Sequence, residues 1–136
     1  MLPSHLRLAV LRLARRLRQQ TVGQITPSQL SALSSIAKAG ELSLGELATI
    51  EQIAPPSMTR IAARLEEIGL VQRRVDAADR RVARVVVSEA GAKLLEETRT
   101  RRDAYLAVRL RGLSEEELDL LERAVPLLER LAVEER

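Results

Sequence analysis

The chain has 136 residues, of which 46% are hydrophobic and 30% charged, and its formal net charge is +3. This length predicts one globular domain with a buried core, because two independent cores would need a longer chain. The sequence contains no cysteine and one histidine, so disulfides, thiolate redox chemistry and thiolate metal sites are excluded.

The same inventory argues against an enzyme, because it offers no glycine-rich phosphate loop and no metal-ligand cluster. We therefore expect no catalytic residue, no metal site and no cofactor. No apolar run approaches the roughly 20 residues of a membrane span, which predicts a cytoplasmic protein with no membrane partner.

The first 25 residues contain five arginines and no acidic residue. Such a segment resembles a transit peptide or a membrane-surface helix. A stripe at near-heptad spacing instead favours a helix that packs on other helices; its members are Leu2, Leu6, Val10, Leu13 and Leu17. His5 lies at the exposed start of this helix without any partner motif, and we interpret it as inert.

Two capping boxes predict the next two helices. Thr26, Pro27 and Gln29 open the first of them, and Gly40 ends it. Its expected buried face consists of Leu30, Leu33, Ile36 and Ala37. Glu41 and Leu42 are expected to be extended and to form a small third strand. Ser43 and Glu46 then open a short helix, the first half of a helix-turn-helix, which runs through Leu47, Ala48 and Ile50.

The pair Pro55-Pro56 predicts the start of another helix, because proline lacks the N–H that a first helical turn leaves unpaired. The apolar positions follow a helical period and predict one buried stripe of Met58, Ile61, Ala62, Leu65 and Ile68. Gly69 is expected to end the helix. Serine, threonine and arginine at its start suit the DNA major groove, although on an isolated helix such residues more often form a solvated face.

Two β-branched runs follow, Val71–Val75 and Val82–Ser88, joined by the polar loop DAADRR. A charged hairpin can protect an edge strand from aggregation, but five arginines exceed that need and indicate a phosphate-contacting surface. A helix followed by a basic hairpin is a winged arrangement. The candidate DNA-binding residues are Ser57, Thr59, Arg60, Arg64, Arg73, Arg74, Asp79, Arg80, Arg81 and Arg84.

The segment from Glu46 to Gly91 resembles the winged helix-turn-helix of the MarR/SlyA family of bacterial transcriptional regulators. The matching features are ELA at 46–48, PS at 56–57, Arg60, LEEIGLV at 65–71, Arg73, the wing pattern D-x-x-D-R-R at 76–81, and Ser88-Glu89 with Gly91. One departure is Gln52, because the family often has glycine in the turn between the two helices.

The resemblance implies roles for three arginines. Arg60 falls where the family reads a base in the major groove, and Arg80 falls where a wing arginine enters the minor groove. Arg81 with Asp79 falls where the family holds the wing in shape. The resemblance also implies a small-molecule effector, often aromatic or phenolic, bound between the dimer helices and the winged lobe.

The C-terminal third predicts two helices. Ser88 caps a long helix that runs to about Arg111, with Gly112 past its end; its stripe contains Leu94, Leu95, Thr98, Arg101, Arg102, Tyr105, Leu106 and Val108. A capping box at Ser114 opens the last helix at Glu115, and Pro126 inside that helix should kink it or cost about 3 kcal/mol. Its apolar face consists of Leu118, Leu121, Val125, Leu128 and Ala132, widened by Leu120, Leu127 and Leu131.

The terminal helices carry more leucine than one core of this size uses, which predicts a homodimer. The expected dimerisation residues are Leu6, Val10, Leu13, Leu17, Leu118, Leu121, Val125 and Leu128. We therefore expect a mainly α protein with a small β-hairpin wing, forming one domain over residues 1–136. Dimerisation helices occupy about 1–25 and 92–136, and the winged helix-turn-helix lobe about 26–91.

The expected function is that of a sequence-specific regulator of transcription. It would bind a pseudo-palindromic double-stranded DNA operator as a homodimer and act as a ligand-responsive repressor. The alternative is a helical protein-protein interaction module without DNA binding. Salt separates the two, because binding through phosphate contacts weakens steeply as the salt concentration rises.

Overall fold

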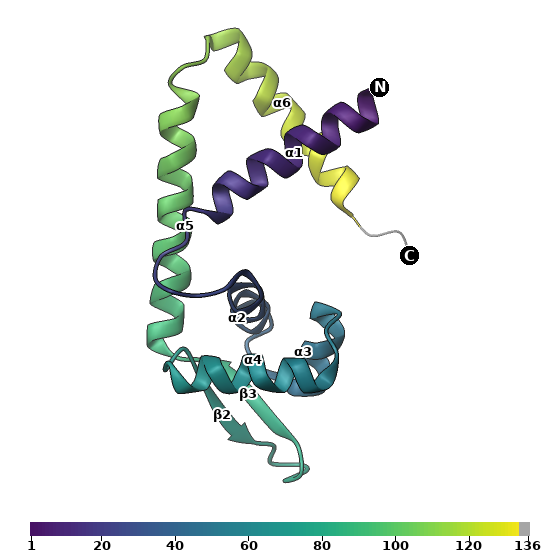
Figure 1. Ribbon diagram of the computed structural model, residues 1–136, viewed down its shortest axis with the longest axis vertical. Helices are drawn as coiled ribbons and strands as arrows, with labels where there is room; N and C mark the ends of the chain where they lie inside the picture. Colours follow the sequence, from purple (N-terminus) through teal and green to yellow (C-terminus); the bar gives the residue numbers. More distant parts are fainter. Residues whose placement is uncertain (134–136) are drawn as a thin grey trace. The chain divides into compact units, whose positions relative to one another are not determined.

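The computed structural model describes residues 1–133 and shows a mainly helical chain with one small antiparallel sheet (Figure 1), as the sequence predicted. The helices are α1 (Leu2–Arg18), α2 (Pro27–Ala39), α3 (Leu44–Glu51), α4 (Pro55–Glu67), α5 (Glu89–Leu110) and α6 (Glu115–Ala132). The strands are β1 (Leu42–Ser43), β2 (Val71–Val75) and β3 (Ala83–Val87), in the order β1-β3-β2. No helix among the described residues is both long and apolar enough to cross a membrane.

The chain divides into two compact units, Met1–Arg102 and Asp103–Arg136, with the boundary inside α5. The core of the first unit lies where α2, α3, α4 and the sheet meet. Its largest fully buried side chains are Leu33, Ile36, Leu47, Met58, Leu65, Val71 and Val85. This core fixes α4 and the hairpin β2–β3 in one unit, which matters because both carry candidate site residues.

Three capping boxes start α2, α3 and α6 at the residues that the sequence predicted. In each box, the N-cap hydroxyl accepts the backbone N–H three residues on: Thr26 from Gln29, Ser43 from Glu46 and Ser114 from Glu117. The side chain of that third residue accepts the N-cap's own N–H in return. Each box therefore satisfies two backbone donors that a helix start leaves unpaired.

Helix α4 begins at Pro55, as predicted, and its stripe is largely buried. Met58, Ala62 and Leu65 are buried, while Ile61 is half-buried. Ile68 lies just past the helix and is 37% exposed, because the chain turns away there through Gly69 at φ +80°.

Several sequence-based expectations were wrong in detail. Ala37 is exposed, and Ala32 takes the expected place in the core because α2 turns that side toward α3 and α4. The short third strand is present but lies at Leu42–Ser43, one residue later than expected, where Leu42 pairs with Val85. The last strand is Ala83–Val87, because Val82 donates its N–H to the Asp79 carbonyl and still belongs to the hairpin turn.

Helix α5 is tied to the lobe at its start and again about three turns later. Ser88 accepts the Gly91 N–H through its hydroxyl oxygen and donates its O–H to the Gly69 carbonyl, at 3.1 and 2.6 Å. Thr98 is buried and accepts the Val22 N–H at 3.3 Å. Thr98 was predicted to lie on the packed stripe, whereas Arg101 and Val108, also predicted there, are exposed in the single chain.

In the second unit, α6 continues as one helix across Pro126. Its apolar face is uncovered in the single chain, since Leu118, Leu121, Val125 and Leu128 are 38 to 48% exposed. In the first unit, α1 has no buried residue, and Val10 and Leu13 are 46% and 49% exposed.

Candidate nucleic-acid interface

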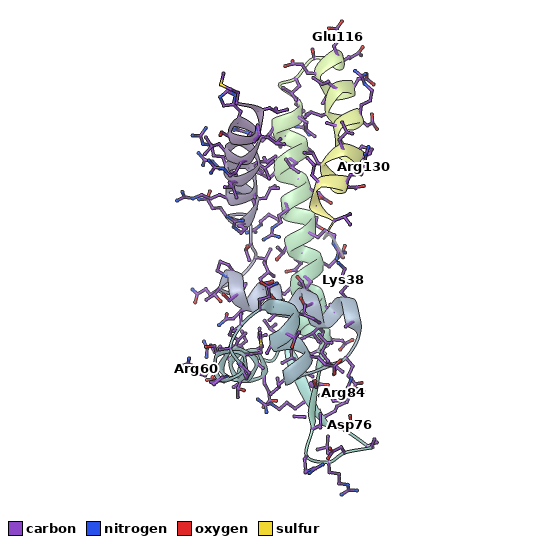
Figure 2. The ribbon with its side chains drawn as sticks, turned by 90° about the vertical axis from the view of Figure 1, so that its right-hand side faces the viewer. Lys38, Arg60, Asp76, Arg84, Glu116 and Arg130 are labelled. Carbon is purple, nitrogen blue, oxygen red and sulfur yellow. The ribbon has the colours of Figure 1, made fainter. Side chains whose placement is uncertain are left out.

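Helices α3 and α4 form the helix-turn-helix, and the turn between them places polar side chains at the start of α4. The Thr59 hydroxyl donates to the Pro55 carbonyl at 2.9 Å, which fixes it against the first turn. Arg60, labelled in Figure 2, is exposed. Its Nη2 donates to the Ser57 hydroxyl at 3.4 Å. A guanidinium has five donors in a planar fork, so Arg60 keeps donors for a base edge.

Two further arginines of the predicted set form ion pairs on the lobe's surface. Arg64 lies 3.3 Å from Glu67 on the same helix, and Arg73 of β2 lies 3.0 Å from Glu66 of α4. Exposed pairs of this kind contribute little to stability, so a phosphate can replace the carboxylate at little cost.

The tip of the hairpin is shaped by two aspartates. Asp76 accepts the backbone N–H groups of Ala78 and Asp79 at 2.7 and 3.2 Å. Asp79 accepts from Arg81 Nε and Nη2 at 3.0 and 3.1 Å, a bidentate pair, and also from the Arg81 backbone N–H. These bonds from Arg81, side chain before backbone, hold the pKa of Asp79 below its ordinary value. The tip is therefore a hydrogen-bonded turn that presents Arg80 outward, where that residue is exposed.

Arg84, included with the DNA-contacting arginines from its sequence position, has a different environment. Its side chain is only 26% exposed and its guanidinium faces Glu41, Glu46 and Asp76. A hydrogen bond from Arg84 to Glu41 is the main cause of the raised pKa of the arginine. The sequence did not indicate this cluster, because Glu41 and Glu46 are 43 and 38 residues away from Arg84 along the chain.

A cleft of about 330 Å³ lies in the first unit between the end of α1, the start of α2 and α5. Arg18 and Arg102 supply its positive charge, and Ile25 and Leu30 supply apolar surface. Arg102 also donates to the Leu17 carbonyl at 3.1 Å and to the Thr21 hydroxyl at 3.3 Å, so it ties α5 to the end of α1. The sequence had not identified which residues line such a cleft.

These features define a winged helix-turn-helix protein, a class that binds DNA through the second helix and the hairpin. A MarR family model matches residues 25–83. The uncharacterised HTH-type transcriptional regulator Mb0904 of Mycobacterium bovis is 43% identical over 128 residues, which cover 93% of this chain and 90% of that protein. The chain therefore belongs to the MarR family of transcriptional regulators, as the resemblance implied, and it is not an enzyme.

Other relatives are similar over shorter stretches or in fold. The HTH-type transcriptional repressor MdtR of Bacillus subtilis is 36% identical over 94 residues, 69% of this chain and 61% of its own. A MarR family protein from Bacillus stearothermophilus matches with a TM-score of 0.79 at 32% identity, covering 95% of this chain and 91% of that one. A mutant of MepR of Staphylococcus aureus, bound to an oligodeoxyribonucleotide, matches with a TM-score of 0.73 at 24% identity, covering 96% of this chain and 98% of that one. MepR bound to ethidium bromide matches with a TM-score of 0.64 at 23% identity, covering 96% of each chain. At these identities both likenesses concern the fold alone.

Proposed function

We propose that this chain represses transcription by binding a pseudo-palindromic double-stranded DNA operator as a homodimer. The observation that carries the proposal is the pairing, in one unit, of an exposed arginine on α4 with a basic tip locked by Asp76 and Asp79. Arg60 would read a base edge in the major groove, and Arg80 would enter the flanking minor groove. MdtR is a repressor and MepR binds an oligodeoxyribonucleotide, which supports the same assignment here.

A two-fold dimer accounts for the expected shape of the operator. Each subunit would present one α4, so the two half-sites should lie about one helical turn apart. The uncovered leucines of α6 supply apolar surface suited to the partner subunit. Of the predicted DNA-binding residues, Ser57, Thr59, Arg60, Arg64, Arg73, Arg74 and Arg80 remain proposed DNA contacts, with Asp79 and Arg81 proposed to shape the tip.

The test of this proposal compares Arg60→Ala and Arg80→Ala on three DNAs: cognate, half-site-mutated and flank-swapped. Loss of a bidentate base contact should cost Arg60→Ala about 1 to 3 kcal/mol at the cognate site and relax the preference for one base pair in each half-site. Arg80→Ala should weaken binding chiefly where the flanking minor groove is narrow and its potential most negative.

Equal loss on cognate and random DNA would instead mean that both arginines contact only phosphate, with a salt slope shallower by about one unit for each substitution. Unchanged base preference in Arg60→Ala would therefore refute its reading role. If the affinity of the wild type for DNA does not fall as the salt concentration rises, the alternative function, a protein-protein interaction module, would be favoured.

We further propose that a small neutral or anionic molecule in the cleft beside Arg18 and Arg102 relieves repression. A ligand in this cleft would contact the end of α1, α2 and α5 at once. It would therefore change how α1 and α5 hold the winged helix-turn-helix lobe for DNA binding. The binding of ethidium bromide by MepR shows that a protein of this fold takes small molecules. Arg102→Ala should abolish the release of operator DNA by such an inducer, measured by fluorescence anisotropy of the variant's own operator complex with and without the inducer.

With no cysteine and one histidine in the sequence, neither oxidation nor a soft metal should act as the inducer. Peroxide or stoichiometric zinc added to the operator complex should therefore leave it intact in a gel-shift assay. Release by zinc at that level would contradict the assignment of a small organic effector.

A further inference from the structure

Arg84 lies near the start of β3, and its side chain faces three other segments of the lobe. Its Nε lies 2.6 Å from Oε1 of Glu41, just before β1. Its Nη1 lies 3.4 Å from Oε1 of Glu46, in the first turn of α3, and 3.5 Å from Oδ2 of Asp76, at the base of the hairpin tip. Figure 2 labels Arg84 and Asp76 on the hairpin, with Asp76 nearer the tip.

Each partner also has a structural role in its own segment. Asp76 holds the hairpin turn through its other carboxylate oxygen, Oδ1. Glu46 accepts the Ser43 N–H with the same oxygen that faces Arg84, so the start of α3 and the wing share one carboxylate. The side chains of Arg84 and Asp76 are 26% and 22% exposed. Solvent therefore screens this pair less than it screens a surface ion pair.

The charges around Arg84 explain why this one side chain can set the position of the hairpin tip. Three carboxylates converge on a single guanidinium, so removing the guanidinium would leave like charges facing one another. Their repulsion would push the hairpin tip away from β1 and α3, while the core beneath would remain packed around Val85 and Leu47.

We propose that Arg84 is a positioning residue: it sets the wing's orientation relative to the helix-turn-helix and does not itself bind DNA. This inference rests on the proposed function, because it explains how Arg80 would be held for the minor groove while Arg60 reads the major groove. Arg84 thereby leaves the set of proposed DNA contacts and becomes the residue that orients one of them.

The substitution that separates positioning from phosphate contact is Glu41→Gln. If Arg84 bound phosphate, removing its strongest partner would free the guanidinium, and binding would tighten on every DNA with an unchanged flank preference. If Arg84 positions the wing, Glu41→Gln loosens the clamp that Arg84 forms with Glu41, Glu46 and Asp76, and the ratio of affinities for narrow-groove and wide-groove flanks falls. The two roles therefore predict different changes in one measured ratio.

The matched control is Arg74→Gln. Arg74 is directly opposite Arg84 in the strand register, is exposed, and loses the same charge when substituted. We expect Arg84→Gln to lower the flank ratio about fivefold, as a coupled network residue can, while Arg74→Gln lowers affinity for all flanks alike. Arg84→Lys keeps the charge and should recover part of the ratio.

Arg84→Gln should add nothing to the flank ratio of Arg80→Ala, because both act through the same groove contact. Additive losses in the double variant would overturn the proposal, as would an unchanged ratio in Glu41→Gln. Thermal unfolding of each variant confirms that the lobe is folded.

A second measurement needs no DNA and keeps the two proposals apart. Asp76 donates its N–H to the Val82 carbonyl and Val82 donates to the Asp79 carbonyl, so these amides report on the closed tip. Their hydrogen exchange should speed up about tenfold in Arg84→Gln and stay near wild type in Arg74→Gln. Unchanged exchange would overturn the clamp even if the wild type binds its operator as proposed. Faster exchange in Arg84→Gln, together with a wild type that does not bind its operator, would overturn the proposed function and leave the positioning role standing.

Discussion

Gln52 is the non-glycine residue with positive φ among the described residues, at φ 55° and ψ 43°. The sequence marked this position because the family often has glycine there. A side chain in the left-handed region brings its Cβ close to the following carbonyl, so glutamine is strained where glycine is not. The turn between α3 and α4 therefore forms although Gln52 is strained in the conformation that the turn requires.

Gln52→Gly should therefore raise the free energy of unfolding by about 0.5 to 1 kcal/mol, the strain relieved less the entropy that glycine loses on folding. Urea unfolding at a fixed protein concentration measures the change. Gln52→Val is the matched opposite and should destabilise the fold, because a β-branched residue tolerates positive φ poorly. A Gln52→Gly variant no more stable than wild type would show that the turn is not strained.

The residues that the sequence predicted well are those whose partners are a few positions away. The bidentate pair of Asp79 and Arg81 matches the role that the resemblance implied, and it spans two positions. The clamp around Arg84 was missed, because nothing in a sequence says which distant carboxylates a strand arginine will meet once the chain is folded.

At the scale of helices and strands, the sequence likewise predicted the features that depend on neighbouring residues and missed those that depend on distant ones. Capping boxes predicted the starts of α2, α3 and α6, because N-cap and partner are three residues apart. The helical period placed Met58, Ala62 and Leu65 in the core. The choice of Ala32 over Ala37 depended on where α3 and α4 lie against α2, which the period alone does not give.

The junction between the hairpin and α5 requires a glycine at position 91. A Cβ built there would lie 2.2 Å from the Leu70 carbonyl oxygen and 2.8 Å from Val87 Cγ1. Backbone cannot yield as a flexible side chain does, so Gly91→Ala should cost about 2 to 3 kcal/mol, measured by chemical unfolding.

Gly45→Ala is the control for that substitution, because Gly45 also lies in a first helical turn but its Cβ would meet the Ser43 hydroxyl at 4.0 Å. It should change stability by a few tenths of a kcal/mol at most, or raise it, since alanine favours helix. If Gly45→Ala lost as much stability as Gly91→Ala, the close contact between a Cβ and the Leu70 carbonyl would not be the cause of the loss at position 91.

The whole-molecule prediction concerns the association of two chains into a dimer. Leu121 and Leu128 on α6 are 45% and 42% exposed in the single chain. Burying this face in an interface of about 2,000 Å² or more would stabilise a dimer by about 25 cal/mol per Å² of apolar surface, less the free-energy costs of association. The double variant Leu121→Glu/Leu128→Glu should sediment as a monomer at micromolar concentration, and it should also lose operator binding. A wild type that sediments as a monomer would contradict the homodimer.

The clamp also determines what can be exchanged between relatives. A chimaera that takes only the hairpin, residues 71–87, from another family member would bring a new residue 84 but keep Glu41 and Glu46 of this chain. The transplanted tip would then face two carboxylates selected with a different partner. The exchangeable module is thus the whole stretch from Glu41 to Arg84, in which the acids and their arginine travel together.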